Sequence, residues 1–208
     1  NFYFSKLIFF NLIFKMFHSN PSFNKKKRKI VFEDSDDDVV EQKDCNIIRK
    51  GNNIYYYEAI DKKPILELIS QLKDLEAILI NLKYTYDVNP VIKLHIYSEG
   101  GDAFMGLSIY DFIKTLKIPV HTYIDGLIAS AATFLFLAGK KRFMTENSNI
   151  LIHQISTGFW GKFEDLKDEC RNTTELMKIA KKIYIDNTSM SKKTIDDIIK
   201  RELYLTYQ

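Results

Sequence analysis

A serine and a histidine in this chain each stand in a sequence context that suits a reacting group. Ser130 lies within residues 126–132, where small residues flank it on both sides, and His153 follows the apolar run 150–152. A serine hydroxyl is a weak nucleophile at neutral pH and becomes a strong one when a neighbouring base takes its proton. Brought together, the two side chains could attack an acyl group. Taken singly, Ser130 is more typical of a helix N-cap and His153 of a buried strand residue.

A pair of glycines supplies a possible second part of such a site. Gly100 and Gly101 follow an alternating apolar stretch at residues 91–97. Attack on an acyl group creates an oxyanion that needs backbone N–H donors, and paired glycines let the backbone approach a ligand closely. A plain turn after a strand is the other interpretation.

The elements that must position these residues follow from hydrophobic periodicity. We predict an α/β fold in which strands alternate with helices, as in a mostly parallel sheet with helical crossovers. The expected strands are residues 54–60, 91–97, 120–124, 142–144 and 150–152. The expected helices begin near Pro64 and at residues 104, 131 and 162, and Ser191 is the expected N-cap of a last helix.

The first quarter of the chain has a different character. Residues 1–52 are predicted to be a disordered or non-native tail, because a basic block at 25–29 and an acidic block at 33–38 repel internally and bury nothing. The basic block is open to two interpretations, a solvated linker or a nuclear address. The apolar run 7–14 is too short to span a membrane, and a targeting role for it stays open. One domain is expected over residues 53–208, and we expect it to be incomplete at its C-terminus.

Composition limits the classes of function. The net charge is only +3, with 46% hydrophobic and 27% charged residues, which favours a globular domain with no nucleic-acid surface and no membrane segment. Two cysteines without metal-ligand spacing argue against a disulfide framework and a metal site, and they favour a reducing compartment such as the cytoplasm.

Four motifs in order resemble the proteolytic subunit of the ATP-dependent Clp protease family, which has the ClpP/crotonase-like fold of stacked strand–helix (ββα) units. They are Ser-Glu-Gly-Gly at 98–101, Gly-Leu-Ser-Ile-Tyr-Asp at 106–111, Gly-Leu-Ile-Ala-Ser-Ala-Ala at 126–132, and Ile-Leu-Ile-His-Gln-Ile at 150–155. Each motif alone is weak, but their order is specific, and the resemblance covers residues 53–206.

The resemblance implies a serine endopeptidase that needs no cofactor. It makes Ser130 the nucleophile, His153 the base, and the amides of Gly101 and Ala131 the oxyanion hole. It places peptide binding at Gly100, Asp102, Ala103, Phe159 and Trp160, and it makes residues 162–189 a protruding handle helix. It also implies stacked heptameric rings of identical subunits, a peptide or unfolded-protein substrate, and an AAA+ unfoldase as partner. For Phe159 and Trp160, ordinary hydrophobic packing is the other interpretation.

Three residues depart from the family pattern near the expected site. Glu99 stands where the family has a proline, Ile128 where it has an alanine, and Ile155 where it has a proline. These substitutions affect loop shape and leave every reacting atom in place.

The third member of the triad is predicted at Glu202, where the family has an aspartate. Ile195, Ile198, Ile199 and residue 202 follow helical spacing, so we expect Glu202 on a buried helix face, where a carboxylate needs a partner such as His153. Glutamate fills this role in some other serine hydrolases. A solvated glutamate at the helix end is the alternative, and Asp196 or Asp197 would then be the next candidates.

Two other functions remain open at this point. The first is a catalytically inactive ring subunit, which the Glu202 substitution favours and the Ser130–His153 pair opposes. The second is acyl-CoA chemistry on the related crotonase fold, which uses similar glycine amides without a serine–histidine pair at these positions.

Overall fold

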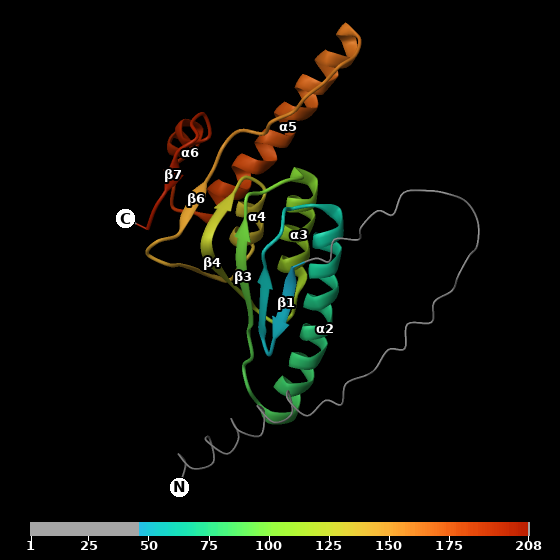
Figure 1. The fold of residues 1–208 in the computed structure, drawn as a ribbon, viewed down its shortest axis with the longest axis vertical. Coiled ribbons are helices and arrows are strands. Elements are labelled where there is room, and N and C mark those ends of the chain that lie inside the picture. The colour runs from blue at the N-terminus through green and yellow to red at the C-terminus, as the bar shows by residue number, and fades with distance from the viewer. Residues whose placement is uncertain (1–45, 208) are drawn as a thin grey trace, which may run out of the picture. The chain divides into compact units, whose positions relative to one another are not determined.

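The structure, a computed structural model, describes residues 46–207 of the chain (Figure 1). The strands are β1 (Ile47–Lys50), β2 (Asn53–Tyr56), β3 (Ile92–Ser98), β4 (Val120–Ala129), β5 (Lys141–Met144), β6 (Asn149–Leu151) and β7 (Tyr204–Leu205). The helices are α2 (Lys62–Tyr86), α3 (Ala103–Thr115), α4 (Ala132–Leu137), α5 (Phe163–Asn187) and α6 (Lys192–Ile198). The predicted alternation of strands and helices is confirmed.

The strands form one sheet in the order β1-β2-β3-β4-β6-β7, with β5 also paired to β4. Strands β2, β3, β4, β5 and β6 run parallel, and only β1 and β7 pair antiparallel with their neighbours. Strand β4 pairs with β5 through residues 121–124 and with β6 through residues 127–129. The second half of β4 therefore carries the chain to the place where Ser130 and the strand before His153 meet.

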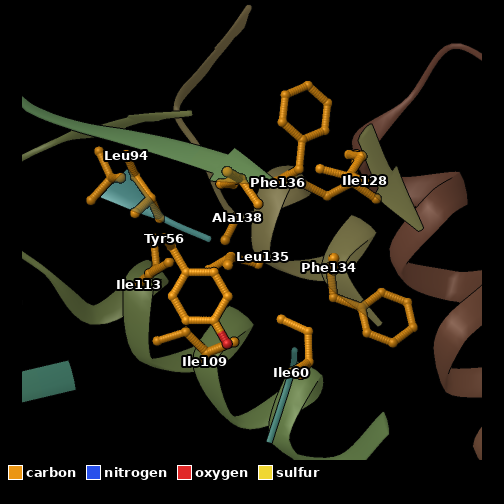
Figure 2. Close-up of a cluster of buried hydrophobic side chains, with 14 of the residues drawn as sticks. Tyr56, Ile60, Leu94, Ile109, Ile113, Ile128, Phe134, Leu135, Phe136 and Ala138 are labelled. Atoms are coloured by element: carbon orange, nitrogen blue, oxygen red, sulfur yellow. The ribbon is translucent and has the colours of Figure 1, made fainter. Parts of the chain in front are cut away.

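The hydrophobic core lies between one face of this sheet and helices α2, α3 and α4. Alternate residues of the strands point into it, as the two-residue period of a strand requires. Figure 2 shows part of this core, with side chains from strands and from α3 and α4 in contact: Tyr56, Ile60, Leu94, Ile109, Ile113, Ile128, Phe134, Leu135, Phe136 and Ala138.

Three helices, α2, α3 and α6, begin at polar N-cap residues. Asp61 starts α2 and accepts from the Lys62 N–H, and Asp102 starts α3 and accepts from the Met105 N–H at 2.9 Å. Ser191 starts α6 and accepts from the Thr194 N–H at 3.1 Å, which confirms its predicted role.

The start of the ordered domain differs from the expectation. Residues 47–50, assigned above to the tail, form β1, which pairs antiparallel with β2 across a turn at Gly51. Gly51 has a φ of 60°, a backbone conformation that glycine adopts without strain. Ile47 is buried against the core, so this short apolar pair belongs to the domain even though charged residues surround it.

Helix α5 extends away from the sheet (Figure 1), and only its C-terminal half joins the core, through Ala180, Ile183 and Tyr184. Within residues 46–207, no helix is long and apolar enough to cross a membrane.

Candidate active site

Ser130 occupies the sharp turn between β4 and α4. Its φ is 53°, which is a left-handed conformation that side-chain-bearing residues adopt at a cost of about 1–2 kcal/mol. Strained strand-to-helix turns of this kind present nucleophilic serines in other hydrolases. The Ser130 N–H donates to the carbonyl oxygen of Leu151 at 2.9 Å, so the turn is tied directly to the end of β6. The half-buried serine thereby lies next to the strand that leads to His153.

The two glycines lie against the same turn. A Cβ on Gly100 would meet the Ala129 carbonyl oxygen at 2.6 Å and the Ser130 Cβ at 2.7 Å, so only glycine fits there. Gly100 and Gly101 have φ values of 96° and 146°, which also favour glycine. The paired glycines therefore allow the backbone of this loop to pack closely against Ser130.

Two backbone amides near Ser130 lack a backbone acceptor among residues 46–207. Neighbouring backbone groups already form hydrogen bonds. The Ile60 N–H donates to the Gly100 carbonyl at 2.8 Å, and the Asp102 N–H donates to the Ile60 carbonyl at 2.7 Å. The N–H groups of Gly101 and Ala131, in contrast, donate to no backbone carbonyl among residues 46–207. Ala131 N lies 3.3 Å from the Cβ position of Gly100, so the second amide borders the glycine loop directly. Two such donors can stabilise an anion that forms on an atom attacked by Ser130.

His153 follows β6 and is half-buried. Its Nδ1 lies 2.5 Å from the carbonyl oxygen of Gln154. A carbonyl only accepts, so Nδ1 carries the proton of the neutral ring and Nε2 carries the free lone pair. This is the tautomer that a general base needs. In this single chain, no hydrogen bond joins the His153 ring to Ser130 or Glu202 among the described residues.

Glu202 does not lie where the helical spacing placed it. Helix α6 ends at Ile198, and the chain turns at residues 199–201, so the period of Ile195 and Ile199 does not continue to residue 202. The expectation of a buried face is wrong for Glu202, whose side chain is exposed. Asp197 is exposed as well, and Asp196 pairs with Lys181 at 2.6 Å. The role of Glu202 in a triad stays a prediction.

The residues expected to bind peptide fall into two groups. Gly100, Asp102 and Ala103 form the loop and first turn of α3 beside Ser130, with Asp102 also serving as the N-cap. Phe159 and Trp160 lie in the irregular segment before α5, where they are 43% and 100% exposed. Trp160 therefore does not pack against residues 46–207.

One contact behind the serine was missed by sequence reasoning. Thr133, in the first turn of α4, donates through its hydroxyl to the Ser130 carbonyl at 2.6 Å, and it also contacts the buried Tyr184 of α5. No local sequence pattern predicts the contact between Thr133 and Tyr184, because the two residues are 51 positions apart.

The sheet face opposite the helices carries a row of stacked rings. Tyr55, His95, Tyr123 and Phe143 stack in sequence across β2 to β5, with ring centroids 4.6–4.7 Å apart. Asp125 accepts from the Tyr57 hydroxyl at 2.7 Å and contacts His95 Nδ1 at 3.1 Å. Burial and the hydrogen bond to Asp125 raise the pKa of Tyr57 to about 12.

A mostly parallel sheet, a strained serine directly after β4, a histidine shortly after β6 and two amides without a backbone acceptor among residues 46–207 define a ClpP/crotonase-like protein with a candidate serine-hydrolase site. A family model described as Clp protease matches residues 38–208, and the chain therefore belongs to the Clp protease family. A mutant of ClpP1 from Listeria monocytogenes has a similar structure, with a TM-score of 0.64. It is 24% identical over 75% of this chain and 83% of its own, a similarity that supports the fold.

Proposed function

We propose that this chain is a serine endopeptidase that hydrolyses peptides and unfolded proteins as the proteolytic subunit of an ATP-dependent Clp protease. The observation that carries the proposal is the strained Ser130, tied by its N–H to the carbonyl of Leu151 and flanked by the free amides of Gly101 and Ala131. The contact of His153 Nδ1 with the Gln154 carbonyl supports a role as base, because a proton on Nδ1 leaves Nε2 able to accept the serine proton.

In the proposed reaction Ser130 Oγ attacks the peptide carbonyl carbon while His153 takes its proton. The Gly101 and Ala131 amides hold the oxyanion, and His153 then protonates the leaving amine, which leaves an acyl-enzyme. Water, deprotonated by His153, hydrolyses this ester and regenerates Ser130. We assign the orienting carboxylate to Glu202, which must approach His153 from its exposed position. The residues proposed to hold the peptide are Gly100, Asp102, Ala103, Phe159 and Trp160.

Helix α5 supports the proposal of a ring assembly. Outside the core it exposes apolar side chains in one region: Phe163 is 69% and Leu166 46% exposed, close in sequence to the exposed Trp160. Exposed apolar side chains gathered on a protruding element are typical of an interface between subunits. We propose that identical subunits form rings through this region and that an AAA+ unfoldase delivers substrate. Cys170 on this helix is a free exposed thiol, which suits a reducing compartment such as the cytoplasm.

An inactive ring subunit is the second candidate function. The exposure of Glu202 and the lack of a hydrogen bond between Ser130 and His153 among the described residues favour it. The active peptidase would be favoured instead if assembly of the subunits brings Ser130, His153 and Glu202 into contact.

The test is peptidase activity of the assembled protein on short fluorogenic peptides, with Ser130→Ala as the comparison. We expect Ser130→Ala to lower kcat at least about 1,000-fold while circular dichroism and oligomer mass stay unchanged. Equal activity of the two proteins would overturn the assignment of Ser130. A wild-type protein that forms rings and cleaves nothing would favour the inactive subunit.

A further inference from the structure

A buried hydrogen-bond chain runs from α5 to the backbone of Ser130. Tyr184 of α5 is 3% exposed, and its hydroxyl lies 2.6 Å from Thr133 Oγ1 in α4. Thr133 is 1% exposed, and its Oγ1 lies 2.6 Å from the Ser130 carbonyl oxygen, which also accepts from the Thr133 N–H at 3.0 Å. The two side chains thus connect a helix of the periphery with the candidate nucleophile.

The direction of each hydrogen bond follows from the number of protons. A carbonyl oxygen only accepts, so the single proton of the Thr133 hydroxyl points to Ser130. The Tyr184 hydroxyl must then donate to Thr133 Oγ1. Burial raises the pKa of Tyr184 to about 12, so this donor keeps its proton at any pH at which a peptidase works. Hydrogen bonds linked in this way in a buried setting strengthen one another.

The carbonyl that receives this chain belongs to a strained residue. With φ at 53°, Ser130 occupies a conformation that persists only where its surroundings hold it. Its N–H is held by Leu151 and its carbonyl by Thr133. A small rotation of either peptide unit would redirect the Ser130 side chain, whose Cβ packs against Gly100.

We propose that Tyr184, acting through Thr133, is a positioning residue that holds the backbone of Ser130 in its reactive conformation. The inference rests on the proposed peptidase function and deepens it. In this proposal the C-terminal part of α5 helps to hold the backbone of Ser130. A displacement of α5 would then alter catalysis although α5 does not contact the substrate there. The alternative is that Tyr184 only fills space, since its ring also packs against Phe134 with centroids 5.7 Å apart.

Three variants separate these roles. Tyr184→Phe removes one oxygen and keeps the ring packing, Thr133→Val removes the hydroxyl at constant shape, and Thr133→Ser restores a hydroxyl. We expect kcat on a fluorogenic peptide to fall about tenfold in Tyr184→Phe and in Thr133→Val, with KM nearly unchanged, and to stay close to wild type in Thr133→Ser. The double variant should be no slower than Thr133→Val alone, because both changes break the same chain.

Tyr110→Phe is the matched control. Tyr110 accepts from Asn187 Nδ2 at 2.9 Å at the same end of α5, and this bond has no path to Ser130. A loss of kcat in Tyr184→Phe no greater than that in Tyr110→Phe would overturn the proposal, because both would then reflect a general loosening of α5.

Two further readouts separate failure of this inference from failure of the proposed function. A fluorophosphonate probe reacts with an activated serine: if wild type labels and Tyr184→Phe labels at the same rate, only the inference fails. If wild type does not label, the peptidase function fails. Amide hydrogen exchange then tests the support itself, since residues 130–134 should exchange faster in Tyr184→Phe than in Tyr110→Phe. Equal exchange in the two variants would overturn it.

Discussion

The N–H of Ser130 donates to the carbonyl oxygen of Leu151 at 2.9 Å, which extends the pairing of β4 with β6 to the turn that holds the serine. Ser130 directly follows β4, and Leu151 ends β6, two residues before His153. Because β4 and β6 run parallel, their carboxyl ends meet at one edge of the sheet. The strand register therefore places the candidate nucleophile and the candidate base after neighbouring strand ends.

Gly100 should be far less tolerant of a side chain than Gly51, although both have positive φ. Gly100→Ala forces a Cβ into the Ala129 carbonyl and the Ser130 Cβ, whereas nothing lies within 4 Å of a Cβ on Gly51. We expect Gly100→Ala to lower the free energy of unfolding by about 3 kcal/mol or more and to abolish activity. Gly51→Ala should cost about 1 kcal/mol and leave activity intact. Urea denaturation of both variants measures this, and equal losses would contradict the close packing.

Glu202→Gln should lower kcat about 100-fold with little change in KM, because an amide can orient the His153 ring but cannot stabilise its charged form. Glu202→Asp should keep appreciable activity, since it preserves the charge. Asp197→Asn is the matched control, because it removes an exposed carboxylate nearby. Steady-state kinetics that show no loss in Glu202→Gln would mean that the Gln154 carbonyl alone orients His153.

Stability should fall at high pH through two tyrosines. The pKa values of Tyr57 and Tyr184 are raised to about 12 from an ordinary value of 10. A raised folded-state pKa stabilises the protein fully below the unfolded-state pKa, and the stabilisation is lost as pH rises from about 10 to 12. The free energy of unfolding should therefore decline over this range less steeply in Tyr57→Phe than in wild type. Parallel curves for the two proteins would contradict the raised pKa of Tyr57.

Much of this architecture could be predicted from periodicity and caps. The parallel strands, the helix after Pro64 and the Ser191 cap follow from local patterns. Glu202 shows where that reasoning fails. No glycine or proline marks the end of α6, so the hydrophobic spacing predicts a helix that continues beyond Ile198. Strand β1 was missed because its four residues lie beside a charged tail, and only pairing with β2 stabilises them.

The motifs of the candidate site could be predicted from the sequence, but the contacts that hold Ser130 in place could not. Ser130, His153 and the paired glycines stand in recognisable local sequences. The hydroxyl chain through Thr133 and Tyr184 depends on how α5 packs against α4, and long-range packing of this kind leaves no local signal.

The central claim is that Ser130 is an activated nucleophile. Its most direct test is reaction of the full-length assembled protein with a fluorophosphonate, followed by peptide mass spectrometry. The serine oxygen attacks phosphorus and fluoride leaves, so the mass increase identifies the reacting residue. We predict one labelled site, on the peptide that contains Ser130, and its loss in Ser130→Ala and in His153→Ala. An assembled wild-type protein that remains unlabelled at Ser130 would contradict the account.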